Sequence, residues 1–85
     1  MMQHHLAVQA RLRPETLERV LRVVRHRGFH ICAMNMETAP GTDDINIEMT
    51  VASARPVELL FSQLSKLVDV AHVEIQQPTS QQIRA

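Results

Sequence analysis

Residues 29–53, FHICAMNMETAPGTDDINIEMTVAS, contain two strand-like runs around one short insert of turn-forming residues. The runs are expected to span Phe29–Glu37 and Ile45–Ala52, because the side chains in each alternate with the two-residue period of a strand. The insert contains Pro40, Gly41 and two aspartates, which favour a reversal of the chain. This stretch therefore predicts an antiparallel hairpin.

Every second residue of the first run could bind a soft metal or fill an apolar contact: His30, Cys32, Met34 and Met36. Because successive side chains of a strand point to opposite sides, these four are expected to share one face, opposite Phe29, Ile31 and Ala33. Residues two apart on a strand lie about 7 Å from each other, so three of them would not converge on one ion without a bend. We therefore expect this face to be an interface whose sulfur side chains fill an irregular contact.

The sequence on either side of the hairpin adds two helices and two strands. Upstream, residues 5–12 alternate like a strand with one buried face, and residues 14–27 have the spacing of an amphipathic helix that stops at Gly28. Downstream, a second helix is expected to begin near Pro56, with Ser53 as its candidate cap, and a fourth strand to span residues 69–76. The predicted core positions are Leu17, Val20, Leu21 and Val24 in the first helix, Val57, Leu60, Phe61, Leu64 and Leu67 in the second helix, and Ala71, Val73 and Ile75 in the fourth strand.

The element order β-α-β-β-α-β predicts an α+β, ferredoxin-like domain, with two helices on one face of a four-stranded antiparallel sheet. Residues 1–77 are expected to form this single domain, and residues 78–85 a polar C-terminal tail. The second strand would be an edge, and an edge strand that is apolar on both sides needs a cover. The fold alone names no activity.

The composition excludes several classes of function. Nine basic and nine acidic residues give no net charge, unlike the basic footprint of a nucleic-acid binder. The two aromatic residues, Phe29 and Phe61, are expected in the core and leave no platform for stacking bases. No apolar run is long enough to span a bilayer and no signal peptide is recognised, so a cytoplasmic location is expected.

Residue patterns for catalysis are also missing. The turn after the first strand contains neither a glycine-rich phosphate loop nor a Cys-x-x-Cys metal motif, and the single cysteine excludes an internal disulfide. We therefore predict no catalytic, cofactor-binding or metal-binding residue in this chain. The arginines of the first helix are expected to be solvated or interface charges.

Two segments resemble a known family. Residues 14–31, PETLERVLRVVRHRGFHI, and residues 62–74, SQLSKLVDVAHVE, are similar to ACT domains in the regulatory subunits of acetohydroxyacid synthase, also called acetolactate synthase. The resemblance implies a non-catalytic small subunit that activates a large catalytic subunit in valine, leucine and isoleucine biosynthesis. The catalytic partner would use thiamine diphosphate, Mg and FAD, and the small subunit would form a homodimer within a heterotetramer.

The resemblance also implies an effector loop after the first strand, where relatives bind valine at an Asn followed closely by Pro-Gly. The corresponding positions here are Arg11, Leu12, Arg13, Pro14, Glu15 and Thr16. They keep the proline but have no asparagine and carry Glu15 in place of the glycine, whose backbone would approach a carboxylate. A second carboxylate there repels the ligand, so this loop is expected to be degenerate and the chain insensitive to valine.

The sequence therefore predicts an activating subunit that contacts its partners through His30, Cys32, Met34 and Met36, together with Arg22 and Arg25. A free-standing ACT-type module that senses an amino acid is the alternative. Activation of a catalytic subunit would distinguish the two.

Overall fold

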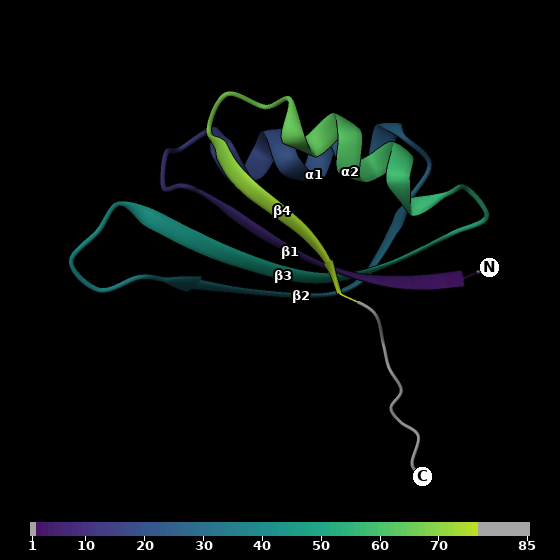
Figure 1. Cartoon of the computed structure of the whole chain (residues 1–85), viewed down its shortest axis with the longest axis horizontal. Coiled ribbons are helices and arrows are strands. Elements are labelled where there is room, and N and C mark those ends of the chain that lie inside the picture. The colour runs from purple at the N-terminus through teal and green to yellow at the C-terminus, as the bar shows by residue number, and fades with distance from the viewer. Residues whose placement is uncertain (1, 77–85) are drawn as a thin grey trace, which may run out of the picture.

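Four strands and two helices follow one another in the predicted order β-α-β-β-α-β (Figure 1). This computed structural model describes residues 2–76, and the predicted tail at 78–85 lies outside the described residues. The elements are β1 (Met2–Arg11), α1 (Thr16–His26), β2 (His30–Thr38), β3 (Asp44–Ser53), α2 (Val57–Ser65) and β4 (Val70–Gln76).

The four strands form one antiparallel sheet in the order β2-β3-β1-β4. Strand β2 is therefore an edge, as predicted, and β4 is the other edge. Both helices lie on the same face of the sheet, and the opposite face is uncovered (Figure 1). The predicted fold class is confirmed.

The core lies between the sheet and the two helices. Alternate residues of β1 and β3 supply its floor, and the apolar stripes of α1 and α2 cover them. Each large side chain buried in this way contributes about 1.5–3 kcal/mol relative to exposure. The largest fully buried side chains are Leu6, Val8, Val20, Val24, Ile45, Ile47, Val51, Leu60 and Leu64. Of the two aromatic residues predicted to be core, Phe29 is buried, but Phe61 is 36% exposed at the margin of the α2 stripe.

Strand β2 contains one residue more than the segment of β3 with which it pairs. Ile31 lies opposite Val51 and Ala33 lies opposite Thr50, so Cys32 is the extra residue of a β-bulge. The bulge reverses the alternation of side chains along the rest of the strand.

The predicted common face of His30, Cys32, Met34 and Met36 is therefore wrong. Met34 and Met36 pair with Met49 and Ile47, whose side chains are buried under the helices, and so they lie on the helix side. His30 pairs with Ala52 and lies on the opposite side of the sheet from these methionines.

A second bulge shifts the start of β4. Gln9 pairs with His72, whereas Ala10 pairs with Val70, so Ala71 is the extra residue. Val70 packs against the core and Ala71 is exposed, which reverses the prediction for these two positions. Val73, beyond the bulge, is buried as expected.

A hydrogen-bonded bridge joins the turn after α1 to the segment before α2. The Ser53 hydroxyl donates to the Gly28 carbonyl oxygen at 2.9 Å and accepts a hydrogen bond from the Arg55 backbone N–H at 3.0 Å. Pro56 occupies the N-cap of α2, without a side-chain cap, so Ser53 ties two turns together rather than capping the helix. Gly28 has a φ of 85°, a conformation that a glycine adopts without a steric penalty.

Candidate functional site

The helix layer leaves part of β2 uncovered. Met34 is 40% exposed and Met36 is 42% exposed, although both lie on the side of the sheet that the helices occupy. Strand β2 is an edge, so its outer backbone groups also have no partner strand among the described elements. An apolar, unpaired edge of this kind is prone to bind another chain.

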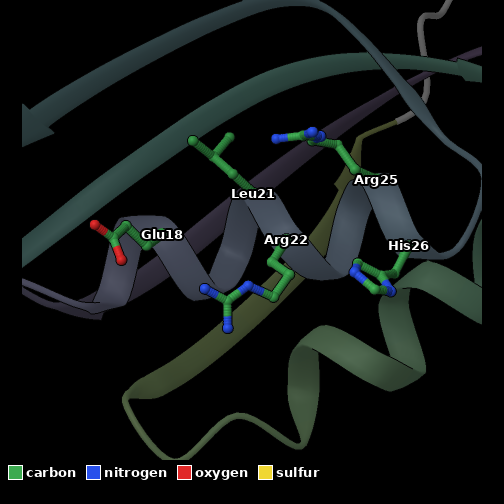
Figure 2. Close-up of a pocket in the computed structure, with 5 residues that line it drawn as sticks. All are labelled: Glu18, Leu21, Arg22, Arg25 and His26. Carbon is green, nitrogen blue, oxygen red and sulfur yellow. The ribbon is translucent and has the colours of Figure 1, made fainter.

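Helix α1 extends this apolar surface. Its C-terminal cap, Arg27, donates to the Gln63 side chain of α2 at 2.9 Å, so the flank of α1 that carries Arg27 faces α2. Leu21 lies on the other flank by the 100° rotation per residue of an α-helix, extends toward the side of β3 and β2 (Figure 2), and is half-buried. We call Leu21, Met34 and Met36 together the β2 strip.

The two arginines predicted at the interface project from α1 in different directions. A hollow on the outer surface of α1 is lined by Glu18, Leu21, Arg22, Arg25 and His26 (Figure 2). Leu21 and Arg25 extend from one side of the helix, whereas Arg22 and His26 extend from the other (Figure 2). All five side chains come from a single helix, and one helix cannot enclose a ligand. Of the two arginines, Arg25 lies on the same side of α1 as Leu21 of the β2 strip, and Arg22 does not.

His30 and Cys32 are separated from the β2 strip by the thickness of the sheet. The Cys32 thiol is exposed, and its sulfur lies 4.0 Å from the side-chain nitrogen of Gln3 and 4.0 Å from the His30 carbonyl oxygen. Within residues 2–76, no group of three or more His, Cys, Asp and Glu side chains is placed to hold a metal ion. No helix in this part of the chain is long and apolar enough to cross a membrane.

The loop predicted as a degenerate effector site forms a tight turn. The Leu12 N–H donates to the Asp43 carbonyl oxygen at 2.6 Å, and the Thr16 N–H donates to the Arg13 carbonyl oxygen at 3.1 Å. The Arg13 guanidinium lies 3.3 Å from the Asp69 carboxylate. Glu15 stands at the N-cap of α1, exposed and without a side-chain capping bond, so its carboxylate is open to solvent.

Thr16 follows Glu15 as the first residue of α1 and is only 2% exposed. Its hydroxyl oxygen has no hydrogen-bond partner among the described residues. The adjoining space between α1 and the start of β4 is too small to admit a water molecule. The sequence offered no signal for this burial, because a threonine at a helix start ordinarily caps the helix.

The comparisons with known proteins agree with the fold. The ACT-domain family model matches residues 12–73. The acetolactate synthase isozyme 2 small subunits of Escherichia coli K12 and Shigella flexneri are each 71% identical to this chain over 87 aligned positions, which cover all of both chains.

Two solved structures share the fold at low sequence identity. The acetolactate synthase small subunit from Thermotoga maritima superposes with a TM-score of 0.81 at 20% identity, over 93% of this chain and 50% of that one. The ACT domain of a GTP pyrophosphokinase from Chlorobium tepidum gives a TM-score of 0.74 at 12% identity, over 88% of this chain and 97% of that one. At such identities, the similarity shows the fold alone.

Proposed function

Since this chain belongs to the family of acetolactate synthase small subunits and contains its ACT domain, we propose that it is a regulatory, non-catalytic subunit of an acetolactate synthase. In this role it binds the large catalytic subunit and raises its activity in branched-chain amino-acid biosynthesis. The identity of 71% along the whole chain is the observation that carries the proposal. Thiamine diphosphate, Mg and FAD would belong to the catalytic partner.

The β2 edge supports pairing of two copies of this chain. Its unpaired backbone can extend the sheet, and the β2 strip supplies apolar area on the helix side. A twofold axis beside an edge strand lets the same residues of both copies meet. Twofold symmetry is the commonest symmetry of soluble oligomers. Met34, Met36 and Arg25 would lie at this contact, whereas His30 and Cys32 would flank it on the other side of the sheet.

Insensitivity to valine is the second part of the proposal. The Glu15 carboxylate occupies the N-cap of α1, where an amino-acid carboxylate would otherwise meet the positive end of the helix. Two carboxylates at one helix end repel each other. The turn is also stabilised by bonds within this chain, namely the backbone hydrogen bonds donated by Leu12 and Thr16 and the ion pair between Arg13 and Asp69.

The test is acetolactate formation by the purified catalytic subunit, titrated with this chain in the presence and absence of valine. We expect the rate to rise to a plateau that valine does not change. No rise in rate would contradict the proposed function and favour the free-standing sensor.

Valine binding is measured separately by calorimetry on this chain, with Glu15→Gly as the matched variant. We expect no saturable heat from the unchanged chain below millimolar valine. Saturable binding there would contradict the role given to Glu15. A signal confined to the variant would show that this carboxylate alone blocks the site.

A further inference from the structure

The face of the sheet opposite the helices carries more acidic than basic side chains. We call it the open face and define it by positions 3, 5, 7 and 9 of β1 and positions 46, 48, 50 and 52 of β3, with their paired residues on β2 and β4. Glu37, Glu48 and Glu74 are all exposed and no lysine or arginine occurs at these positions, while the next pair, Arg11 and Asp44, adds one charge of each sign at the margin of the face. The remaining side chains are histidines, amides, alanines and one threonine.

Three arginines lie together on the other side of the molecule. Helix α1 carries Arg19, Arg22 and Arg25 on its exposed surface against the single acidic residue Glu18. The chain has no net charge, yet its two broad faces differ in sign. A face of one sign attracts a surface of the opposite sign and rejects surfaces like itself.

A hollow interrupts the open face. It has a volume of about 220 Å³ and is lined on this side by His5, Ala33, Asn35, Glu48, Thr50 and Gln76. The imidazole of His5 and the hydroxyl of Thr50 form a hydrogen bond of 2.9 Å, which fixes one wall. Pockets for free small ligands usually measure about 300–1,000 Å³, so the size of this hollow suits a single side chain of a protein partner.

Glu48 also belongs to a wider arrangement on this face. Glu48 and Glu74 are both paired with Ala7, which lies between them on β1 and has a side chain of one carbon. Two strand spacings separate these carboxylates, or about 10 Å at the backbone. A cationic side chain that enters the hollow would therefore meet Glu48 at its wall, with Glu74 outside the hollow on the far side of Ala7.

We propose that the open face is the docking surface for a basic region of the large catalytic subunit, with a lysine or arginine of that subunit in the hollow beside Glu48. This inference rests on the proposed function. Pairing of two copies through the β2 edge leaves both open faces free and joins them into one continuous acidic surface. Buried aromatic and arginine side chains in well-packed pockets commonly dominate the energy of protein contacts.

The experiment titrates the catalytic subunit with the full chain carrying Glu48→Lys and Glu74→Lys together, and records acetolactate formation and direct binding. We expect the concentration for half-maximal activation to rise at least tenfold. Asp43→Lys is the control, since it reverses an exposed charge in the β2–β3 loop, outside the open face. This control should stay within twofold of the unchanged chain.

Neutral variants protect the test against an effect of added lysines on folding. Glu48→Gln with Glu74→Gln should weaken binding and make it less dependent on salt concentration, because two charge contacts are removed. Activation by the charge-reversed chain at the concentrations needed by the unchanged chain would overturn the inference while leaving the proposed function intact. Failure of the unchanged chain to bind would instead refute the proposed function, and the docking surface with it.

Discussion

The hydroxyl of Thr16 is buried at the start of α1 without a hydrogen-bond partner among the described residues. A buried polar group without a partner costs about 1–3 kcal/mol, more than the loss of an ordinary exposed hydrogen bond. Burial of the Thr16 hydroxyl therefore lowers the stability of the domain, and a substitution that removes this hydroxyl can measure the loss.

Thr16→Val replaces this hydroxyl with a methyl group of similar shape. We expect the free energy of unfolding to increase by about 1 kcal/mol, measured by urea denaturation. The control is Thr42→Val, since the Thr42 hydroxyl donates to the Ala39 carbonyl oxygen and accepts from the Asp44 N–H. That substitution should lower stability by about 1 kcal/mol. A loss of stability in the Thr16 variant would mean that its hydroxyl has a partner in solution.

Gly28 and Gly41 allow a matched test of backbone conformation against crowding. Both have positive φ, 85° and 76°, but a Cβ on Gly28 would lie 3.1 Å from Nε of Arg55, whereas a Cβ on Gly41 would meet nothing within 4 Å. We expect Gly41→Ala to cost about 1 kcal/mol and Gly28→Ala about 2 kcal/mol, from thermal and urea unfolding. Adding Arg55→Ala should reduce the excess cost at Gly28. If Gly28→Ala and Gly41→Ala lower the free energy of unfolding equally in the chain that keeps Arg55, then Arg55 moves aside freely.

At the scale of the element, local patterns predicted the helices and strands, but not the register of the two edge strands. The valine and leucine spacing of α1 and the alternation in β1 and β3 are properties of each segment alone. The structure confirms them except at Leu21, which was predicted to be core but is half-buried on the flank of α1. The bulges at Cys32 and Ala71 depend on which residue of a neighbouring strand lies opposite, which no local pattern contains. The predicted interface set was therefore divided between two faces of the sheet.

Deletion of Cys32 tests the bulge directly. It removes the extra residue and leaves the pairs on both sides in place, so we expect unfolding free energy to change by less than about 1 kcal/mol. Deletion of Asn35 is the control. It should turn Met36 to the open face and cost about 2 kcal/mol, because a one-residue slip reverses every later side chain. Similar losses from the two deletions, measured in urea, would argue against the bulge.

Met36→Asp and Asn35→Asp place the same charge on neighbouring residues of β2, on opposite sides of the sheet. If two copies pair through the β2 strip, the aspartate at 36 lies in the apolar contact and should weaken self-association at least tenfold. The aspartate at 35 lies on the open face and should leave it within about twofold. Analytical ultracentrifugation measures both. Equal dissociation constants would remove the β2 strip from the self-contact.

At the scale of the whole molecule, the sequence predicted the family and the architecture but not the separation of charge between the two broad faces. The count of nine acidic and nine basic residues suggested a neutral molecule. Alternation within each strand places Glu48 and Glu74 away from the core, but only the pairing of both with Ala7 shows that they lie close together on that surface. The candidate docking surface is therefore a product of topology rather than of any sequence motif.

The small size of the domain makes its stability depend on partners. A chain near this length buries only about 60% of the surface that its unfolded form exposes, and the β2 strip remains partly uncovered. We expect the melting temperature to rise with the concentration of the chain. A partner at 100 times its dissociation constant adds about 2.7 kcal/mol. Calorimetric scans over a hundredfold range of concentration test this, and an unchanged melting temperature would contradict self-pairing.

The bulge at Ala71 bears on how far such pairing can spread. When two β2 edges join, each end of the combined sheet is a β4 strand, and a flat β4 would let further copies add without limit. The extra residue bends β4 and interrupts its ladder of backbone groups. Strand β2 also has a bulge, but residues 33–38 beyond it pair regularly with β3 and include the exposed Met34 and Met36, whereas no large apolar side chain of β4 is exposed. If two copies pair through β2, this difference between the edges would stop the assembly at a closed particle instead of letting it grow into a fibre.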